Sequence, residues 1–148
     1  MILYLDTSAL VKLFIREAGS DVVFDAVERS TAQATHLLAY AEACAVFARL
    51  ERETARRGWF EQLRGALDRA WRDLDVLLPD ETLVRRAGTL AQLFGLRGFD
   101  SIHLAAAEAI NRPGEMTFVC FDRRLAAAAR EAGLSALGAG ATEPGPGM

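Results

Sequence analysis

The sequence predicts an α/β fold, a three-layer α/β/α domain with a central parallel sheet of about five strands. Short apolar segments typical of strands alternate along the chain with longer segments in which apolar residues recur every three or four positions, as they do in helices. The length of 148 residues suits one domain. The composition, 51% hydrophobic and 25% charged, is that of an ordinary soluble globular protein.

The first half of the chain is expected to alternate strands with helices. The first strand covers residues 2–5, which are apolar or aromatic and run directly into Asp6. A short helix follows, with Thr7 or Ser8 as its cap. The remaining segments of this half are a helix at 20–30, a strand at 32–35, helices at 36–53 and 58–74, and a strand at 73–79.

Start and stop signals mark the helices of the second half. Asp80 near the cap position and Gly95 after the last turn bound one helix, and Asp100 lies at or near the start of the next. The expected segments are helices at 80–95 and 99–111, a strand at 117–121, a helix at 123–133 and a short strand at 134–138. We therefore expect one domain over residues 1–138, followed by a flexible tail rich in Gly and Pro over 139–148.

Cysteine and histidine usage gives no disulfide framework and no zinc pattern. Cys44 and Cys120 are isolated, and His36 and His103 share no metal-ligand spacing, so structural roles are predicted for both histidines. No apolar run approaches the roughly 20 residues that span a bilayer, and the first residues lack the features of a signal peptide. These observations favour a cytoplasmic protein without membrane contact.

The net charge is −3, from 17 basic and 20 acidic residues. A nucleic-acid partner usually requires a basic surface, so this total by itself argues weakly against one. If cations neutralise four of the acids, however, 16 acids face 17 bases and the balance becomes +1. The total charge therefore does not exclude a polyanionic substrate.

Four acidic residues occupy positions that solubility alone does not explain. Asp6 and Asp122 end strands, at the edge where parallel sheets place their functional sites. Glu42 lies on the apolar face of its helix, where an unpaired carboxylate is costly, so it needs an Arg or a cation as partner. Asp100 follows Phe99 and precedes an Ala-rich helix. For each of the three aspartates, capping of the following helix is the competing interpretation.

One cation site explains the four acids together better than four separate roles do. Carboxylates that converge repel one another, and a bound cation removes that repulsion. An all-oxygen ligand set favours Mg²⁺ or Mn²⁺ over Zn²⁺. Such a site lowers the pKa of bound water and stabilises the charge of an in-line phosphoryl displacement.

Four segments carry a resemblance to a known family. They are LYLDTSALVKLFIREAGS, LLAYAEACAVFARL, RGFDSIHLAAA and FVCFDRRLAAAAREAGL, and they occur in the family's order and at its spacing over nearly the whole chain except the tail. With these segments the sequence resembles a PIN domain, and specifically a VapC-type toxin ribonuclease of toxin–antitoxin pairs.

The resemblance implies a function, a site and partners. Asp6, Glu42, Asp100 and Asp122 would be catalytic and would bind one or two Mg²⁺ or Mn²⁺ ions, which activate a water molecule to cleave RNA phosphodiester bonds. The first and fourth strands would lie side by side, so that Asp6 and Asp122 share a metal. A cognate antitoxin and a second copy of the chain would be the protein partners.

Residues close to these acids in the sequence are candidates for polar or RNA contacts. Lys12, Arg16, Arg123 and Arg124 each follow a site acid along the chain and are predicted to contact phosphates, with an ion pair to Asp122 as the alternative for Arg123. Many relatives carry Thr or Ser two residues before the fourth acid, where this chain has Cys120, a poor hydrogen-bond partner. Ser8 is predicted to supply a polar contact instead, with helix capping as the alternative.

Competing interpretations differ in what the acids do. One is a PIN-domain nuclease of RNA processing or DNA metabolism without an antitoxin. Another is a catalytically silent nucleic-acid-binding PIN module, against which the four intact acids argue. A signalling receiver domain also carries acids at strand ends, but it requires an acidic pair after the first strand and a Lys late in the chain, whereas the only Lys here is Lys12.

Overall fold

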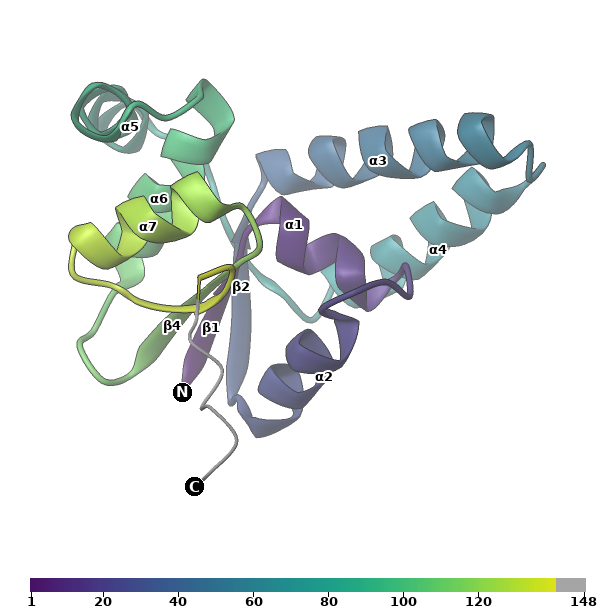
Figure 1. Cartoon of the computed structure of the whole chain (residues 1–148), viewed down its shortest axis with the longest axis horizontal. Helices are drawn as coiled ribbons and strands as arrows, with labels where there is room; N and C mark the ends of the chain where they lie inside the picture. Colours follow the sequence, from purple (N-terminus) through teal and green to yellow (C-terminus); the bar gives the residue numbers. More distant parts are fainter. Residues whose placement is uncertain (141–148) are drawn as a thin grey trace.

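The computed structural model describes residues 1–140, and its centre is a five-stranded parallel sheet (Figure 1). The strands are β1 Ile2–Leu5, β2 Ala32–His36, β3 Asp75–Leu77, β4 Met116–Cys120 and β5 Ser135–Gly138. Their order across the sheet is β3-β2-β1-β4-β5, and every neighbouring pair is parallel. The predicted adjacency of the first and fourth strands is confirmed. From residue 141 on, the predicted flexible tail lies outside the described residues.

Helices connect the strands, as the sequence predicted. They are α1 Thr7–Leu10, which continues into the 3-10 helix η1 Val11–Leu13, then α2 Ser20–Arg29, α3 Leu38–Thr54, α4 Trp59–Trp71, α5 Glu81–Phe94, α6 Gly98–Ile110 and α7 Arg123–Glu131. The helix expected from residue 36 begins later because His36 still belongs to β2. No helix within residues 1–140 is long and apolar enough to cross a membrane.

The sequence offered Asp6, and also Thr7 or Ser8, as the cap of the first helix. Asp6, and neither Thr7 nor Ser8, is the N-cap of α1: its backbone is extended, and its side chain accepts a hydrogen bond from the backbone N–H of Ala9. The helix therefore starts directly at the end of β1. An acid that ends a strand and begins a helix is thereby fixed in position from both sides.

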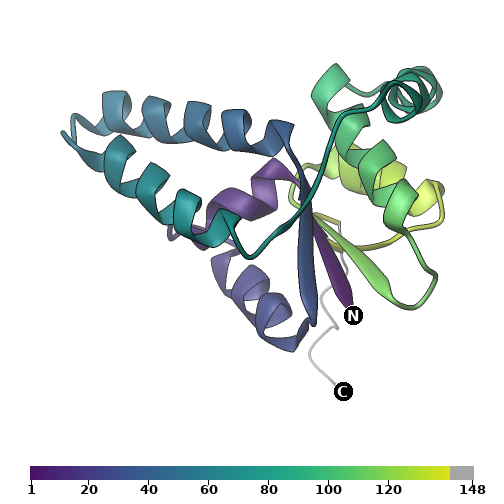
Figure 2. The same ribbon diagram turned by 180° about the vertical axis from the view of Figure 1, so that it is seen from behind.

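Two hydrophobic cores cover the two faces of the sheet. Successive side chains of a strand point to opposite faces, so Tyr4 packs into the core under α5, α6 and α7, whereas Leu3 and Leu5 pack into the core under α1 to α4. Figures 1 and 2 show these two groups of helices on opposite sides of the strands. The predicted three-layer α/β/α arrangement is confirmed.

The pairing of the two central strands brings two of the predicted acids to one edge of the sheet. Leu5 pairs with Val119 in the parallel register of β1 and β4. The backbone N–H of Asp6 donates to the carbonyl of Val119 at 3.2 Å, so the ladder extends by one residue beyond β1. Asp122 follows two residues after the end of β4 and begins α7. Both acids therefore lie at the carboxyl edge of the sheet, where α1 and α7 start.

Candidate active site

Asp6 is the most deeply buried of the four acids. Its side chain is only 4% exposed, and its Oδ1 atom accepts hydrogen bonds from the backbone N–H of Ala9 at 2.9 Å and from the hydroxyl of Ser8 at 2.7 Å. Burial raises the pKa of Asp6, although these hydrogen bonds oppose the rise. The fold thus holds an acid at a place where its negative charge is costly.

Asp122 repeats the arrangement of Asp6 at the end of the neighbouring strand. It is the N-cap of α7, and its Oδ1 atom accepts from the backbone N–H of Leu125 at 2.9 Å. A carboxylate has two oxygens with about four lone pairs between them. Capping with one oxygen is therefore compatible with a cation at the other, and the two interpretations of Asp6 and Asp122 do not exclude each other.

Asp100 has no capping role. Arg97 is the N-cap of α6, and Asp100 lies within the first turn. Within residues 1–140 its carboxylate accepts no hydrogen bond. Burial raises the pKa of Asp100, and so do the negative charges of Asp122, Asp6 and Glu42. Asp100 therefore lies close enough to the other three acids, which come from separate segments of the chain, to be affected by their charges.

Glu42 points from α3 toward α1 and α6, and its side chain is 22% exposed. Its Oε1 atom accepts a hydrogen bond from the hydroxyl of Thr7 at 2.7 Å and lies 2.9 Å from Nε2 of His103. Burial disfavours the charged carboxylate, but the contacts with His103 and Thr7 outweigh it and lower the pKa of Glu42. The partner predicted for Glu42 was an Arg or a cation. Within the described residues the protein itself supplies His103 and Thr7.

His103 connects Glu42 to the core of the sheet. The ring is buried, with Nε2 facing Glu42 and Thr7, and Nδ1 lying 2.8 Å from the hydroxyl of Tyr4. A carboxylate can only accept hydrogen bonds, so Nε2 carries the hydrogen. Tyr4 in turn stacks on Phe118, with ring centroids 5.5 Å apart. The chain of contacts fixes the direction in which Glu42 points.

Sequence reasoning assigned His103 a structural role and did not include Thr7 in the site. His103 is buried as predicted, but it also orients a site acid. One signal pointed to it, because residues three apart share a helix face and His103 follows Asp100 by three positions. The contact with Glu42 joins α6 to α3, and no spacing along the chain encodes it. His36 is buried as expected, and its Nδ1 atom accepts from the backbone N–H of Leu38.

Ser8 and Cys120 lie behind the acids. The hydroxyl of Ser8 donates to Asp6 and accepts from the backbone N–H of Phe121 at 2.9 Å, so this side chain ties the end of β1 to the end of β4. The buried thiol of Cys120 lies 3.5 Å from the backbone carbonyl oxygen of Asp122, to which it donates. Burial and the charge of Asp6 raise the pKa of this thiol, which therefore stays protonated.

The predicted phosphate contacts are distributed unevenly around the site. Lys12 is largely buried: its ammonium group donates to Glu17 at 2.8 Å and lies over the ring of Phe121. Arg123 is an exposed residue at the start of α7, next to Asp122. Arg124 donates to the backbone carbonyl of Gly95 at 3.3 Å.

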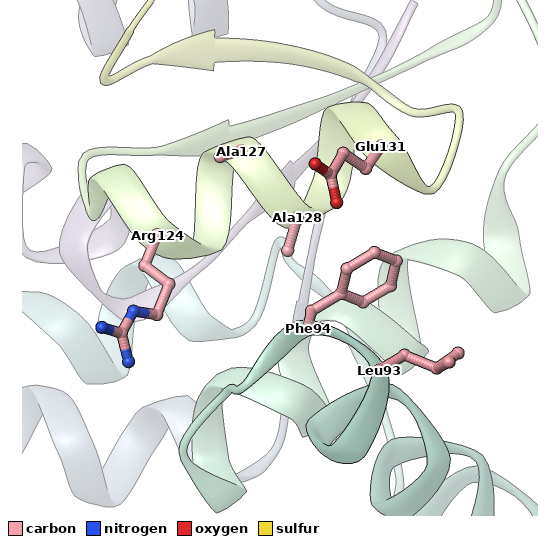
Figure 3. A pocket seen from close by; sticks show the side chains of 6 residues that line it. All are labelled: Leu93, Phe94, Arg124, Ala127, Ala128 and Glu131. Carbon is pink, nitrogen blue, oxygen red and sulfur yellow. The ribbon is translucent and has the colours of Figure 1, made fainter.

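Arg124 also borders a cavity of about 250 Å³ between the end of α5 and α7 (Figure 3). The lining consists of Leu93, Phe94, Arg124, Ala127, Ala128 and Glu131. None of the four site acids takes part in it. This cavity is therefore separate from the site of the four acids.

A larger open cavity of about 500 Å³ lies over the acids themselves. Its lining consists of Glu42, Arg97, Gly98, Phe99, Asp100 and Asp122. Asp6 is not among the lining residues and is buried at the end of β1. Three of the acids therefore face a space wide enough for a polar substrate.

The donor set fits a hard divalent cation, because it consists of carboxylate oxygens from Asp6, Glu42, Asp100 and Asp122 without sulfur. Among residues 1–140, no three His, Cys, Asp or Glu side chains are already gathered around a single ion position. The other three acids nevertheless make ionisation of Asp100 more costly and raise its pKa. A cation between them would remove that cost. With it, the site could activate water and stabilise a phosphoryl displacement.

The chain is similar to proteins of known classes. Residues 3–131 match the family model of the PIN domain. Over 136 residues the chain is 35% identical to Ribonuclease VapC45 of Mycobacterium tuberculosis, an alignment that covers 89% of this chain and 92% of that protein.

Solved structures share the fold at lower identity. The crystal structure of Mycobacterium tuberculosis VapC20, described as a sarcin–ricin loop cleaving toxin, superimposes with a TM-score of 0.64 at 17% identity, over 85% of this chain and 94% of that one. A toxin–antitoxin complex from Klebsiella pneumoniae contains a chain that superimposes with a TM-score of 0.60 at 17% identity, over 81% of this chain and 86% of that one.

Proposed function

Since this chain belongs to the PIN-domain family, and within it to the VapC ribonucleases, we propose that it is an endoribonuclease that acts as the toxin of a toxin–antitoxin pair. The observation that carries the proposal is the position of Asp100. This half-buried acid caps no helix, shares a cavity with Glu42 and Asp122, and is destabilised by their charges. A fold maintains such an arrangement for chemistry, because it gains no stability from it.

We propose Mg²⁺ or Mn²⁺, as one or two ions, for the cofactor. Asp6, Glu42, Asp100 and Asp122 would hold it, since each offers a carboxylate at or beside the cavity. When bound, the cation lowers the pKa of a water molecule and offsets the charge that develops on the phosphoryl group.

The residues around the acids keep them oriented for this chemistry. Ser8 fixes Asp6, and Thr7 together with His103 fixes Glu42. Burial makes the bare negative charge of Asp6 costly and raises its pKa, and a bound cation would offset that cost. The open cavity over the acids leaves room for the RNA strand that the protein would cut.

A cognate antitoxin and a second copy of the chain are the protein partners that we propose. A structural neighbour that is described as a toxin–antitoxin complex supports the antitoxin, and the second copy follows from the resemblance to the family. The identity of the antitoxin is accessible through the gene next to the one that encodes this chain.

Growth of bacteria that express the chain tests the toxin assignment. We expect expression to slow growth, and Asp100→Asn at an equal protein level to leave growth normal. Co-expression of the protein encoded by the neighbouring gene should restore growth. Equal growth with the wild type and the Asp100→Asn variant would overturn the toxin assignment.

A further inference from the structure

The cavity over the acids has a second wall that the proposed chemistry does not use. Its lining includes Arg97 and Phe99, which flank Gly98 at the start of α6. The backbone here is fixed: the carbonyl of Arg97 accepts from the backbone N–H of Ser101 at 2.9 Å, and the Ser101 hydroxyl donates to the carbonyl of Gly98 at 2.7 Å. The two side chains therefore project from a rigid helix start.

Arg97 is the one basic residue in the lining of this cavity, which it shares with Glu42, Asp100 and Asp122. Within residues 1–140 its guanidinium forms no ion pair and no hydrogen bond, although acids border the same space. An exposed guanidinium that no carboxylate occupies is available to bind two oxygens of a phosphate.

Phe99 is 54% exposed. A single exposed apolar side chain is ordinary. The position of Phe99 in the molecule therefore decides whether its exposure indicates a binding role. Another exposed phenylalanine, Phe24, has the guanidinium of Arg16 5.9 Å from its ring centroid. Among the described residues, Phe99 has neither an aromatic nor a cationic partner, and its ring borders the cavity that holds the acids.

We propose that Arg97 and Phe99 form a nucleotide subsite beside the cleavage site, in which Arg97 binds a backbone phosphate and Phe99 stacks on an unpaired base. The inference rests on the proposed ribonuclease function and narrows its substrate to RNA that is single-stranded or bulged at the cut. A paired base is stacked inside its helix and offers no free face to the ring. An unpaired base does, whatever its identity.

A nucleotide suits this wall better than an antitoxin side chain does. A nucleotide presents a phosphate and a base, and this wall offers Arg97 for the phosphate and Phe99 for the base. An apolar protein segment would leave Arg97 buried without a counter-charge, which is costly. A nucleotide gives the guanidinium its partner and covers the ring at the same time.

Cleavage kinetics on two labelled RNAs test the subsite. Both carry the same cleavable sequence, unpaired in one and enclosed in a stem in the other, and both are measured with the purified protein and Mn²⁺ or Mg²⁺. We expect the wild type to cut the unpaired RNA and to spare the stem. Phe99→Ala should raise KM about 5- to 100-fold on the unpaired RNA, and Phe99→Trp should retain a low KM.

Arg97→Gln should also raise KM, and it should lower the slope of log KM against log salt by about 0.7, the share of one phosphate on a single strand. Matched controls lie elsewhere on the surface. Arg112→Gln removes the same charge just beyond the C-terminal end of α6, and Phe24→Ala removes the same ring from α2. Both controls should keep the wild-type KM, and thermal melting of each variant reports whether it is folded.

Each contrary outcome is distinguishable from failure of the proposed function. If the wild type cuts RNA but Phe99→Ala and Arg97→Gln keep its KM, the subsite is wrong and the ribonuclease stands. Equal cutting of stem and unpaired RNA would also show that the subsite is wrong while the ribonuclease function stands. The same conclusion would follow if Phe99→Ala cleaves normally but loses self-association or antitoxin binding, because Phe99 would then serve a protein contact. A wild type that cuts neither RNA overturns the function and the subsite together.

Discussion

Asp100 and Glu42 differ in what the folded protein does to their charge. Burial and the other acids raise the pKa of Asp100. A raised pKa means that the folded state holds the proton more tightly than the unfolded chain does. The free energy of unfolding therefore falls as the pH rises from the unfolded pKa through the folded one. The pKa of Glu42 is lowered, chiefly by the contacts with His103 that overcome its burial. The stability that the charged Glu42 contributes is present above its usual pKa of 4.5 and is lost as the pH falls through its pKa in the folded protein.

Neutralising these two acids should therefore have opposite effects on stability. At pH 7 without metal, Asp100→Asn should raise the melting temperature, whereas Glu42→Gln should lower it or leave it unchanged. Both variants should lose about 10²-fold or more in cleavage rate, the scale of a lost electrostatic group at a reacting centre. Melting curves together with a cleavage assay check this. A stabilised Glu42→Gln protein or a fully active Asp100→Asn protein would contradict the assignment.

Thr7 and Tyr4 should matter for rate more than for substrate binding, because both act through Glu42. Thr7→Val removes the hydroxyl that donates to Glu42, and Tyr4→Phe removes the hydroxyl that contacts His103. We expect kcat to fall about 10- to 100-fold for Thr7→Val, as for other groups that orient metal ligands, and KM for RNA to change little. Thr54→Val is the matched control, since its hydroxyl donates only to the carbonyl of Leu50. A KM effect without a kcat effect would show that Thr7 contacts RNA instead.

At the scale of the elements, a strand–helix junction serves two purposes at once. Asp6 directly follows β1 and caps α1, and Asp122 follows β4 by two residues and caps α7. The sequence presented capping and ligation as alternatives. The geometry makes them compatible, because the capping bonds of both residues end on Oδ1.

Substitutions at Asp6 can separate the two purposes. Asp6→Asn keeps a good cap and removes a buried charge, so the metal-free protein should be at least as stable as the wild type while cleavage is lost. Asp6→Ala removes the cap as well and should be less stable than Asp6→Asn by about 0.5–2 kcal/mol. Urea denaturation of the two variants measures the difference. Equal stabilities would show that Asp6 contributes nothing as a cap.

The strands and helices were predictable because each carries a local signal. Asp80 and Gly95, for example, bound α5 as a cap and a left-handed C-terminal residue. The start of α1 was left open between Asp6 and Thr7 or Ser8, because all three are good caps and only the backbone conformation selects among them. Local signals therefore identify elements better than their first residues.

At the scale of the whole molecule, the sequence singled out four acids, three of which border one cavity, whereas of the side chains that orient them only Ser8 was anticipated. The acids stand out because each is misplaced for its element, and the resemblance to the family places them in order. The contact of His103 with Glu42 spans 61 positions, and that of Ser8 with Phe121 spans 113. Such pairs arise from the sheet order and the packing of α3 against α1 and α6, which no local pattern reveals.

The central claim is that the four carboxylates hold a divalent cation and cut RNA. The most direct test is the cleavage rate of a labelled single-stranded RNA by the purified protein in EDTA, Mg²⁺ and Mn²⁺, beside Asp100→Asn prepared in the same way. We predict cleavage with Mg²⁺ or Mn²⁺, none in EDTA, and a loss of about 10²-fold or more in the variant. Cleavage that continues undiminished in EDTA, or in Asp100→Asn, would contradict the account.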